Sequence, residues 1–519
     1  MLSVAQKMMS KPTSLTAAAS ALAVLSVSAP SSASSVTSAP SVAPIASARA
    51  IDLEVERLRI SAFALFDSRK REEAEKVWEE ALKKAHLADR GYAHGAQALE
   101  AALNLDNRRL DIKGMLADAL YARALAAERD HQDTLLDDLL DRMSLYDVGG
   151  LRAGRWNAPA ELKVDADVDG TEVKLSRYAE DESKRLTLVE ERLLGTTPLH
   201  VPALPRGSYR LVLQAPGRMP VYYPVLLGRQ AQVAIKVKLP PVGAIPAGMV
   251  YIPPGNFVFG AAGEEALRQK FFNTAPAHEV FSNGYLISQH ETTFSEYIEF
   301  LKSLPPEQRE QHRPKVGSTS MTVSGTLDIK QLENGQWQLE SQPLSVMYRA
   351  LAGQLITYKG REKHQNQDWL RMPIGGVSRA DAMAYTAWLN KSGRLPGARL
   401  CTEMEWERAA RGADARDYPM GSTLHAADAN IDITYDKKPD AMGPDEVGSY
   451  PGSRSPFNVD DLVGNVNELL ESSLAPDETV ARGGSYGYDA LTSRTVNRNT
   501  IDATFRQADI GFRICIPLQ

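Results

Sequence analysis

The sequence has few cysteines, no long apolar run and no excess of positive charge. Only two of its 519 residues are cysteines, Cys401 and Cys515, too few for a disulfide framework or a thiolate zinc site. A single disulfide between them is possible. The formal net charge of -6 argues against a nucleic-acid-binding protein, whose domain would be basic. No apolar run approaches the roughly 20 residues that span a bilayer, so we expect no transmembrane helix.

What the sequence does contain is a globular composition spread over a long chain. Hydrophobic residues make up 43% and charged residues 24%, which are values of folded proteins. A chain of this length exceeds one ordinary core, so three or more domains are expected. Changes in residue pattern divide it into a leader, a helical region, a small β domain and a C-terminal α+β domain.

Residues 1–50 resemble an export signal followed by a linker. Lys7 and Lys11 give a basic start, an Ala/Leu/Val-rich run covers 15–27, and small-residue sites follow, in the order of a secretory signal. Residues 31–50 are typical of a flexible spacer. We therefore expect an exported protein, periplasmic or at the cell surface. The alternatives are a truncated membrane anchor or a disordered tail, and a disordered tail would imply a cytoplasmic protein.

A helical pattern covers residues 51–148. Apolar residues recur at spacings that predict one helical face, namely Phe63, Phe66, Ala74, Val77, Trp78, Ala81 and Leu82. Charged residues fill the other faces, as on solvated helices. The stretch that ends at Asp106 is similar to the closing helix of a tetratricopeptide (TPR) repeat, although no fixed period recurs. We expect a TPR-like helical array that packs against or spaces its neighbours.

Short strands replace the helices over residues 149–241. Apolar and polar residues alternate around Leu175, Leu211 and Ile235, which predicts strands with one buried face. Gly-Thr-Thr-Pro and Pro-Arg-Gly-Ser-Tyr turns separate them. This combination of turns and strands resembles a PEGA domain, a small bacterial β-sandwich of surface and exported proteins. The resemblance implies a role in adhesion or spacing, without chemistry.

One apparent metal motif lies in this β block. Asp165-Ala-Asp-Val-Asp-Gly170 has the opening spacing of a helical calcium-binding loop. Such a loop needs a bidentate carboxylate at its twelfth position, which here is Ser176. Strand patterns flank the motif where helices would be required. A polar hairpin turn therefore explains these residues better than a calcium site.

The C-terminal part, residues 246–519, carries an ordered series of motifs. They are Met249-Val-Tyr-Ile-Pro-Pro-Gly, Pro373-Ile-Gly-Gly-Val-Ser, Arg399-Leu-Cys-Thr-Glu-Met-Glu-Trp-Glu-Arg, Val463-Gly-Asn-Val-Asn-Glu and Arg482-Gly-Gly-Ser, with a closing Gly511-Phe-Arg. Together they resemble the formylglycine-generating enzyme, or sulfatase-modifying factor, family. The resemblance implies an α+β fold related to C-type lectins. An insertion-like segment, about 305–369, departs from the family pattern.

Part of this series has a structural explanation. Thr402 can cap the N-terminus of the helix that follows, and Glu405 fits the third helical position of a capping box. Trp406, Ala409 and Ala410 then supply a buried face. We interpret these residues as stabilising the fold.

The chemistry of the family does not transfer to these residues. The resemblance places a copper(I)-binding cysteine pair just after the Gly-Gly-Ser-Tyr motif, at positions that here hold Tyr488 and Ser493. Copper(I) prefers soft thiolate ligands, and no cysteine lies between Cys401 and Cys515. We therefore expect neither copper nor oxidase activity. Both cysteines are interpreted as buried small residues or as one bridge.

A second group of proteins with this fold implies a different metal. The sulfoxide synthases of thiol-histidine biosynthesis bind non-haem iron through histidines of an additional helical bundle. In this sequence, His86, His94 and His131 show no tight metal-ligand spacing. We interpret all three as solvated surface residues.

The family resemblance also implies structural calcium, which hard oxygen ligands favour. The ligands at one site would be the side chains of Asp461 and Glu468 and the carbonyls of Gly464 and Val466. A loop held only by hydrogen bonds is the alternative. A second family site would fall at Asn430 and Ile431, with a carboxylate near Asp440.

The polar loop of residues 485–510 is the expected ligand surface, because it joins aromatic anchors to adaptable polar groups. Its candidate contact residues are Tyr486, Tyr488, Asp489, Ser493, Arg494, Asn497, Arg498 and Asn499. The alternative for the arginines is internal pairing with acids.

These patterns predict a non-catalytic, extracytoplasmic binding or accessory module. Its ligand would be a protein, a peptide or a glycan. One alternative is an oxidoreductase-type enzyme of altered chemistry, with Tyr488, Asp489 and Arg498 as an acid/base cluster. The other is a stalk or regulatory component of a bacterial signalling system.

Overall fold

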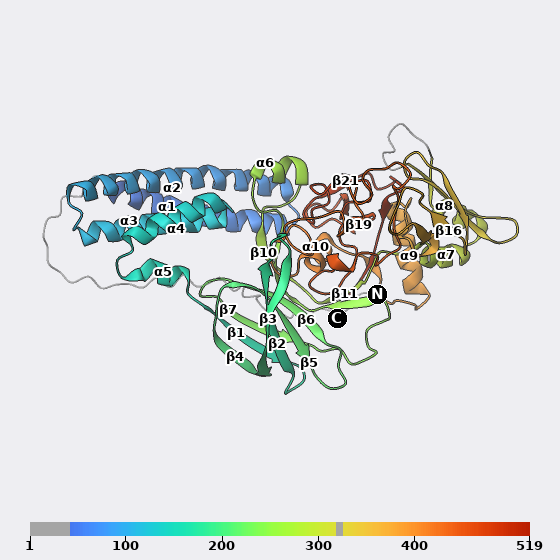
Figure 1. The fold of residues 1–519 in the computed structure, drawn as a ribbon, viewed down its shortest axis with the longest axis horizontal. Helices are drawn as coiled ribbons and strands as arrows, with labels where there is room; N and C mark the ends of the chain where they lie inside the picture. The colour runs from blue at the N-terminus through green and yellow to red at the C-terminus, as the bar shows by residue number, and fades with distance from the viewer. Residues whose placement is uncertain (1–41, 318–324, 519) are drawn as a thin grey trace, which may run out of the picture.

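The chain forms three packed blocks in the computed structural model, which describes residues 42–317 and 325–518 (Figure 1). Helices α1–α4 lie together at one end, two small sheets form the second block, and the C-terminal block mixes helices with short strands. The expected export signal lies outside the described residues. None of the described helices is long and apolar enough to cross a membrane.

The helical block begins earlier and ends later than the sequence pattern predicts. Its helices are α1 (Val42–Asp67), α2 (Arg71–Leu105), α3 (Leu110–Arg129) and α4 (Asp133–Tyr146), followed by the short η1 (Val148–Gly150) and α5 (Leu151–Trp156). The expected spacer is therefore wrong for residues 42–50, where Ala48 already packs against Ala88 and Tyr92. The predicted single face, from Phe63 to Leu82, spans two helices because the chain turns at Arg69, which has a left-handed φ of 58°.

The second block is a sandwich of two sheets, as predicted. Its strands are β1 (Ala160–Ala166), β2 (Glu172–Glu180), β3 (Leu186–Thr196), β4 (Leu199–Leu204), β5 (Gly207–Gln214), β6 (Val221–Leu227) and β7 (Gln232–Val237). The sheet orders are β4-β1-β7 and β3-β2-β5-β6, and Leu175 and Leu211 are buried between them. The motif that begins at Asp165 is not a hairpin, because β1 and β2 belong to different sheets.

The C-terminal block opens and closes on the same sheet, β18-β23-β11-β8. Its first elements are β8 (Met249–Ile252), β9 (Gly255–Phe259), α6 (Glu265–Leu267), η2 (Arg268–Phe272), β10 (His278–Ser282), β11 (Tyr285–Ser288), α7 (Phe294–Lys302) and α8 (Pro306–His312). Its last elements are α9 (Arg379–Lys391), β18 (Arg399–Leu400), α10 (Glu403–Arg411), η4 (Pro451–Ser453), β19 (Asn467–Glu471), β20 (Thr479–Arg482), β21 (Asn499–Ile501), β22 (Ile510–Gly511) and β23 (Ile514–Pro517).

The insertion-like segment is an integral part of this block. It forms β12 (Lys315–Val316), β13 (Thr326–Gln331), β14 (Trp337–Gln342), β15 (Tyr348–Leu351), β16 (Leu355–Thr357), β17 (Asn366–Asp368) and η3 (Trp369–Arg371). Strands β12–β15 make an antiparallel sheet. Ile329 and Leu339 on that sheet share one buried cluster with Tyr297 of α7 and Tyr385 of α9. The segment is therefore held by the main core of the block.

The helical block and the C-terminal block also share a core. Phe66 of α1 and Trp78 of α2 pack in one cluster with Phe257 and Phe259 of β9. At the edge of this cluster, Arg268 is almost fully buried and pairs with Glu75 of α2 at 2.7 Å. The apolar cluster is the main attachment between the two blocks, because burial of apolar surface stabilises more than exposed ion pairs do.

Candidate functional site

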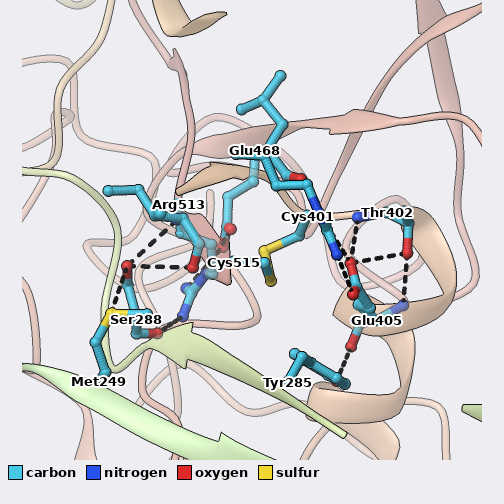
Figure 2. The surroundings of a disulfide bond; sticks show 12 residues. Met249, Tyr285, Ser288, Cys401, Thr402, Glu405, Glu468, Arg513 and Cys515 are labelled. Carbon is cyan, nitrogen blue, oxygen red and sulfur yellow. Dashed lines mark hydrogen bonds and ion pairs between the residues drawn. A yellow bond between two sulfur atoms is a disulfide. The ribbon is translucent and has the colours of Figure 1, made fainter. Parts of the chain in front are cut away.

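The two cysteines form the bridge that the sequence left open. Cys401 and Cys515 are joined by a disulfide that closes 114 residues of chain, and neither side chain is exposed. Figure 2 shows the bridge between the Glu468–Arg513 pair and the capping box of α10. Since the chain has no other cysteine, no thiol remains for soft-metal binding or nucleophilic chemistry.

The capping box beside the bridge is confirmed. The Thr402 hydroxyl accepts a hydrogen bond from the Glu405 backbone N–H at 3.2 Å, and the Glu405 carboxylate accepts one from the Thr402 backbone N–H at 2.9 Å. Trp406 is completely buried below this first turn. The box therefore fixes where α10 begins, and α10 in turn positions Glu403, which pairs with Arg498 of the loop of residues 485–510.

The two positions that hold cysteines in the family enzyme are not an open ligand pair. Ser493 is completely buried, and a Cβ on Gly484 would lie 2.2 Å from its hydroxyl oxygen. Tyr488 is half-buried, and burial raises the pKa of its phenol to about 12. A neutral phenol and an enclosed hydroxyl are poor ligands for copper(I).

Arg498 pairs internally, which is the alternative that the sequence left open for the arginines. Its guanidinium donates to Glu403 at 2.6 Å and to Glu478 at 2.7 Å. Burial would raise the pKa of Glu403, but Arg498 and Arg482 hold it down at about 2, so the acid is ionised at neutral pH. Arg498 is thus a structural residue of the loop, and it is too enclosed to contact a ligand.

The other predicted contact residues fall into a buried group and a partly exposed group. Tyr486 and Asn497 are buried together with Ser493 and Arg498. Those that keep some exposure are Tyr488, Asp489, Arg494 and Asn499. Asp489 accepts a hydrogen bond from the Thr492 backbone N–H at 2.8 Å. The structure does not bring Tyr488, Asp489 and Arg498 into one acid/base cluster, because the Arg498 guanidinium faces Glu403.

The C-terminal block also has a cavity of about 510 Å³ that the sequence did not indicate, and its lining residues lie outside the loop of residues 485–510. It is lined by three segments of the block, within 360–364, 426–438 and 449–452, and includes Glu362, Lys363, His364, Tyr435, Asp436, Lys438 and Tyr450. The segment 426–438 contacts the loop outside the cavity, where the Asp432 backbone N–H donates to the Tyr488 carbonyl at 3.0 Å. The lining mixes both charges with two aromatic rings, as polar ligand sites do.

The predicted calcium region near Asn430 is organised around an arginine. Arg361, from the loop between β16 and β17, donates to the carbonyls of Ala441 and Gly443 at 2.7 and 2.8 Å and to the carboxylate of Asp445 at 2.5 Å. Asp445 supplies the carboxylate that pairs with Arg361, whereas the Asp440 backbone carbonyl accepts from the Tyr348 hydroxyl at 2.9 Å; Asp440 as a calcium ligand stays a prediction. The sequence could not reveal this pairing, because Arg361 and Asp445 lie 84 residues apart.

The other predicted calcium region surrounds Arg513. Both carboxylate oxygens of Glu468 accept from its guanidinium, at 2.5 and 2.7 Å, and the Asp461 carbonyl accepts at 3.1 Å. Glu291 is completely buried beside them, and neither of its carboxylate oxygens has a hydrogen-bond partner among the described residues. Three buried acids thus face one guanidinium, and burial raises the pKa of Asp461 to about 6.

The donor set around Arg513 is compatible with calcium, although no cluster of side chains defines a site. Over residues 42–317 and 325–518, no group of three or more His, Cys, Asp and Glu side chains could hold a metal ion. The family pattern would use two side chains and two carbonyls instead. Each Glu468 oxygen keeps a second lone pair, so its pairing with Arg513 leaves it able to coordinate.

Two of the three histidines of the helical block lie at a different cavity, of about 450 Å³, between the helices and the C-terminal block, and His94 is exposed elsewhere. His86 and His131 line it together with Arg59 and Trp78. Both histidines are exposed, as the sequence predicted. They do not form part of a three-residue metal cluster in the part of the chain that the structure describes.

The C-terminal fold and its loop define a class of protein: an α+β domain of the sulfatase-modifying-factor type that offers no free thiol. Residues 239–517 match the family described as "Sulfatase-modifying factor enzyme 1-like domain", and the chain belongs to that family. The resemblance drawn from the motifs is thereby confirmed. The TPR-like and PEGA-like assignments of the other blocks stay predictions.

Individual proteins are similar to parts of the chain. A hercynine oxygenase of Mycolicibacterium smegmatis is 29% identical over 51% of this chain and 60% of its own length. An inactive Cα-formylglycine-generating enzyme 2 of Mus musculus is 29% identical over 46% of this chain and 74% of its own length. The structure of PvdO from Pseudomonas aeruginosa, 24% identical, covers 52% of this chain and 94% of that one, with a TM-score of 0.35. The chain thus spans about three-fifths of the oxygenase.

Proposed function

We propose that this protein is a non-catalytic, extracytoplasmic binding or accessory protein built on a sulfatase-modifying-factor scaffold. The observation that carries this proposal is the use of both cysteines in one buried disulfide, while Tyr488 and Ser493 stand where the family enzyme has its thiols. Similarity to a relative named as inactive supports it. The disulfide supports an oxidising compartment, since such bridges are rare in the cytosol.

The ligand surface in this proposal is the cavity together with the exposed part of the adjoining loop. Lys363 and Lys438 supply cations, Glu362 and Asp436 supply carboxylates, and Tyr488 adds a half-buried ring. Such a surface suits a polar ligand with hydrogen-bonding groups and an apolar face, which a peptide or a glycan provides.

An oxidase assay tests the non-catalytic part. The purified protein is incubated with copper(I), oxygen and a Cys-x-Pro-x-Arg peptide, and the peptide is then weighed by mass spectrometry. We expect an unchanged peptide mass, because no thiolate is present to bind copper(I). Conversion of the peptide cysteine by the wild-type protein, at a rate above that of copper alone, would overturn this part.

A binding assay tests the ligand surface. Wild-type protein is applied to immobilised glycan and peptide libraries, together with a Y488A/K438A variant and an exposed control, K163A, on the β-sandwich. We expect at least one reproducible signal, reduced roughly tenfold or more in the double variant and unchanged in the control. Tenfold corresponds to about 1.4 kcal/mol of binding free energy. Equal signals from all three proteins would show that the ligand binds elsewhere.

A further inference from the structure

The carbonyls and carboxylate around Arg361 are hard oxygen groups of the kind that bind calcium. Three of them, from Ala441, Gly443 and Asp445, converge on the guanidinium within 2.8 Å. The Asn430 amide donates to the same Gly443 carbonyl at 2.9 Å. Its amide oxygen is buried and lacks a hydrogen-bond partner within the described residues. A metal ion at this place would find the ligands that Ca²⁺ prefers.

The position is already filled by a cation of the chain itself. The side chains of Arg361 and Asp445 are both completely buried. The guanidinium is held between two rings, with its carbon 3.5 Å from the Tyr358 ring centroid and 4.0 Å from that of Tyr435. A cation between aromatic faces is stabilised on both sides, so this arginine has few alternative positions.

The charge balance of this centre is complete without a metal. Asp445 accepts the guanidinium on one carboxylate oxygen and the hydroxyls of Tyr435 and Tyr450 on the other, at 2.6 and 2.7 Å. One buried anion therefore meets one buried cation. Adding Ca²⁺ would place two further positive charges against the guanidinium without a second carboxylate to compensate them, which is unfavourable in a buried site.

We propose that Arg361 replaces a metal ion at this site, and that the insertion serves in part to deliver it. Arg361 lies in the loop between β16 and β17, and the insertion sheet anchors that loop to the core of the block. The region from Asn430 to Asp445 therefore keeps its shape without calcium. This proposal does not depend on the proposed function, because it concerns only how the loop is held.

Removal of the guanidinium should convert the site into a calcium site. We expect R361A to bind one Ca²⁺ more than the wild-type protein in equilibrium dialysis, with a Kd of about 0.1–1 mM, as in weak extracellular sites. Terbium offers a second readout, because Tyr358 and Tyr435 lie against the position and would sensitise its luminescence. We expect a severalfold gain in R361A and loss of that gain in R361A/N430A. Equal calcium stoichiometry in R361A and wild type would overturn the proposal.

A second variant, in which Arg361 is kept, tests the proposal if R361A does not fold. N430A is made in the wild-type background, and its bound calcium is counted by the same dialysis. We expect no change, because the wild-type site holds the guanidinium instead of a metal ion. If N430A binds one Ca²⁺ fewer than wild type, a resident calcium lies there and the proposal is wrong.

Discussion

The two buried arginine centres of the C-terminal block resemble each other in contacts but differ in charge. At Arg361 one carboxylate, Asp445, meets one guanidinium. At Arg513, by contrast, Glu468, Asp461 and Glu291 are all buried around a single guanidinium. The first centre is neutral when fully ionised, whereas the second has two negative charges in excess. An excess of buried charge must be relieved by protons or by another cation.

From this difference in charge we predict that calcium stabilises the Arg513 centre and not the Arg361 centre. The family resemblance suggests calcium at both places, but the residues distinguish them. A buried arginine cannot leave its site when calcium is depleted, whereas a metal ion can. A chelator should therefore destabilise the region around Arg513 and leave the region around Arg361 unchanged.

The largest effect is expected from removing Arg513, the arginine of the centre that has an excess of buried carboxylates. R513M should lower the free energy of unfolding by about 3–5 kcal/mol, because it leaves buried carboxylates without their counter-ion. Urea denaturation at neutral pH measures the change. R349M is the matched control, since Arg349 is 64% exposed and its loss should cost less than about 1 kcal/mol. If R513M lowers the free energy of unfolding no more than R349M does, Arg513 is not the counter-ion that stabilises these buried carboxylates.

An intermediate effect is expected from calcium at the same centre. Millimolar Ca²⁺ should raise the Tm of the wild-type protein, because the cation offsets the excess carboxylate charge, and EDTA should reverse the rise. D461N should abolish the response by removing a predicted ligand. D440N should leave it intact, because Asp440 contributes its backbone carbonyl, to the Tyr348 hydroxyl at 2.9 Å. A wild-type Tm that is the same in calcium and EDTA would contradict calcium binding here.

The smallest effect is expected in the balanced centre. Y450F removes one of two tyrosine hydroxyls that donate to Asp445, so we expect a loss of about 1 kcal/mol in unfolding free energy. Y222F on β6 should be near neutral, because Arg210 contacts the Tyr222 ring, which phenylalanine retains. A loss of 3 kcal/mol or more, far above about 1 kcal/mol for a hydrogen bond, would mean that the Arg361 pair depends on this hydroxyl.

The sequence predicted the features that rest on neighbouring residues. The capping box needs only Thr402 and Glu405, three residues apart, and the fold family follows from short motifs in a fixed order. The alternation around Leu211 likewise reports one strand with one buried face. Each of these signals lies within a few residues of chain, where spacing determines which side chains meet.

The parts that escaped prediction depend on residues far apart in the chain. Arg498 meets Glu403 across 95 residues, so its burial could not be read from the polar composition of its loop. The cavity of about 510 Å³ combines the end of the insertion with segments within 426–438 and 449–452. A single sequence does not show which distant residues meet in space. A polar loop therefore predicts exposure unless its internal partners are known.

The apolar cluster between α1, α2 and β9 places the limits of cooperative folding beyond those of the family match. A fragment that started at residue 239 would leave Phe257 and Phe259 without Phe66 and Trp78. Such a fragment would present an apolar patch to solvent and would tend to associate. The segment that matches the family, residues 239–517, is therefore shorter than the segment that shares this buried core.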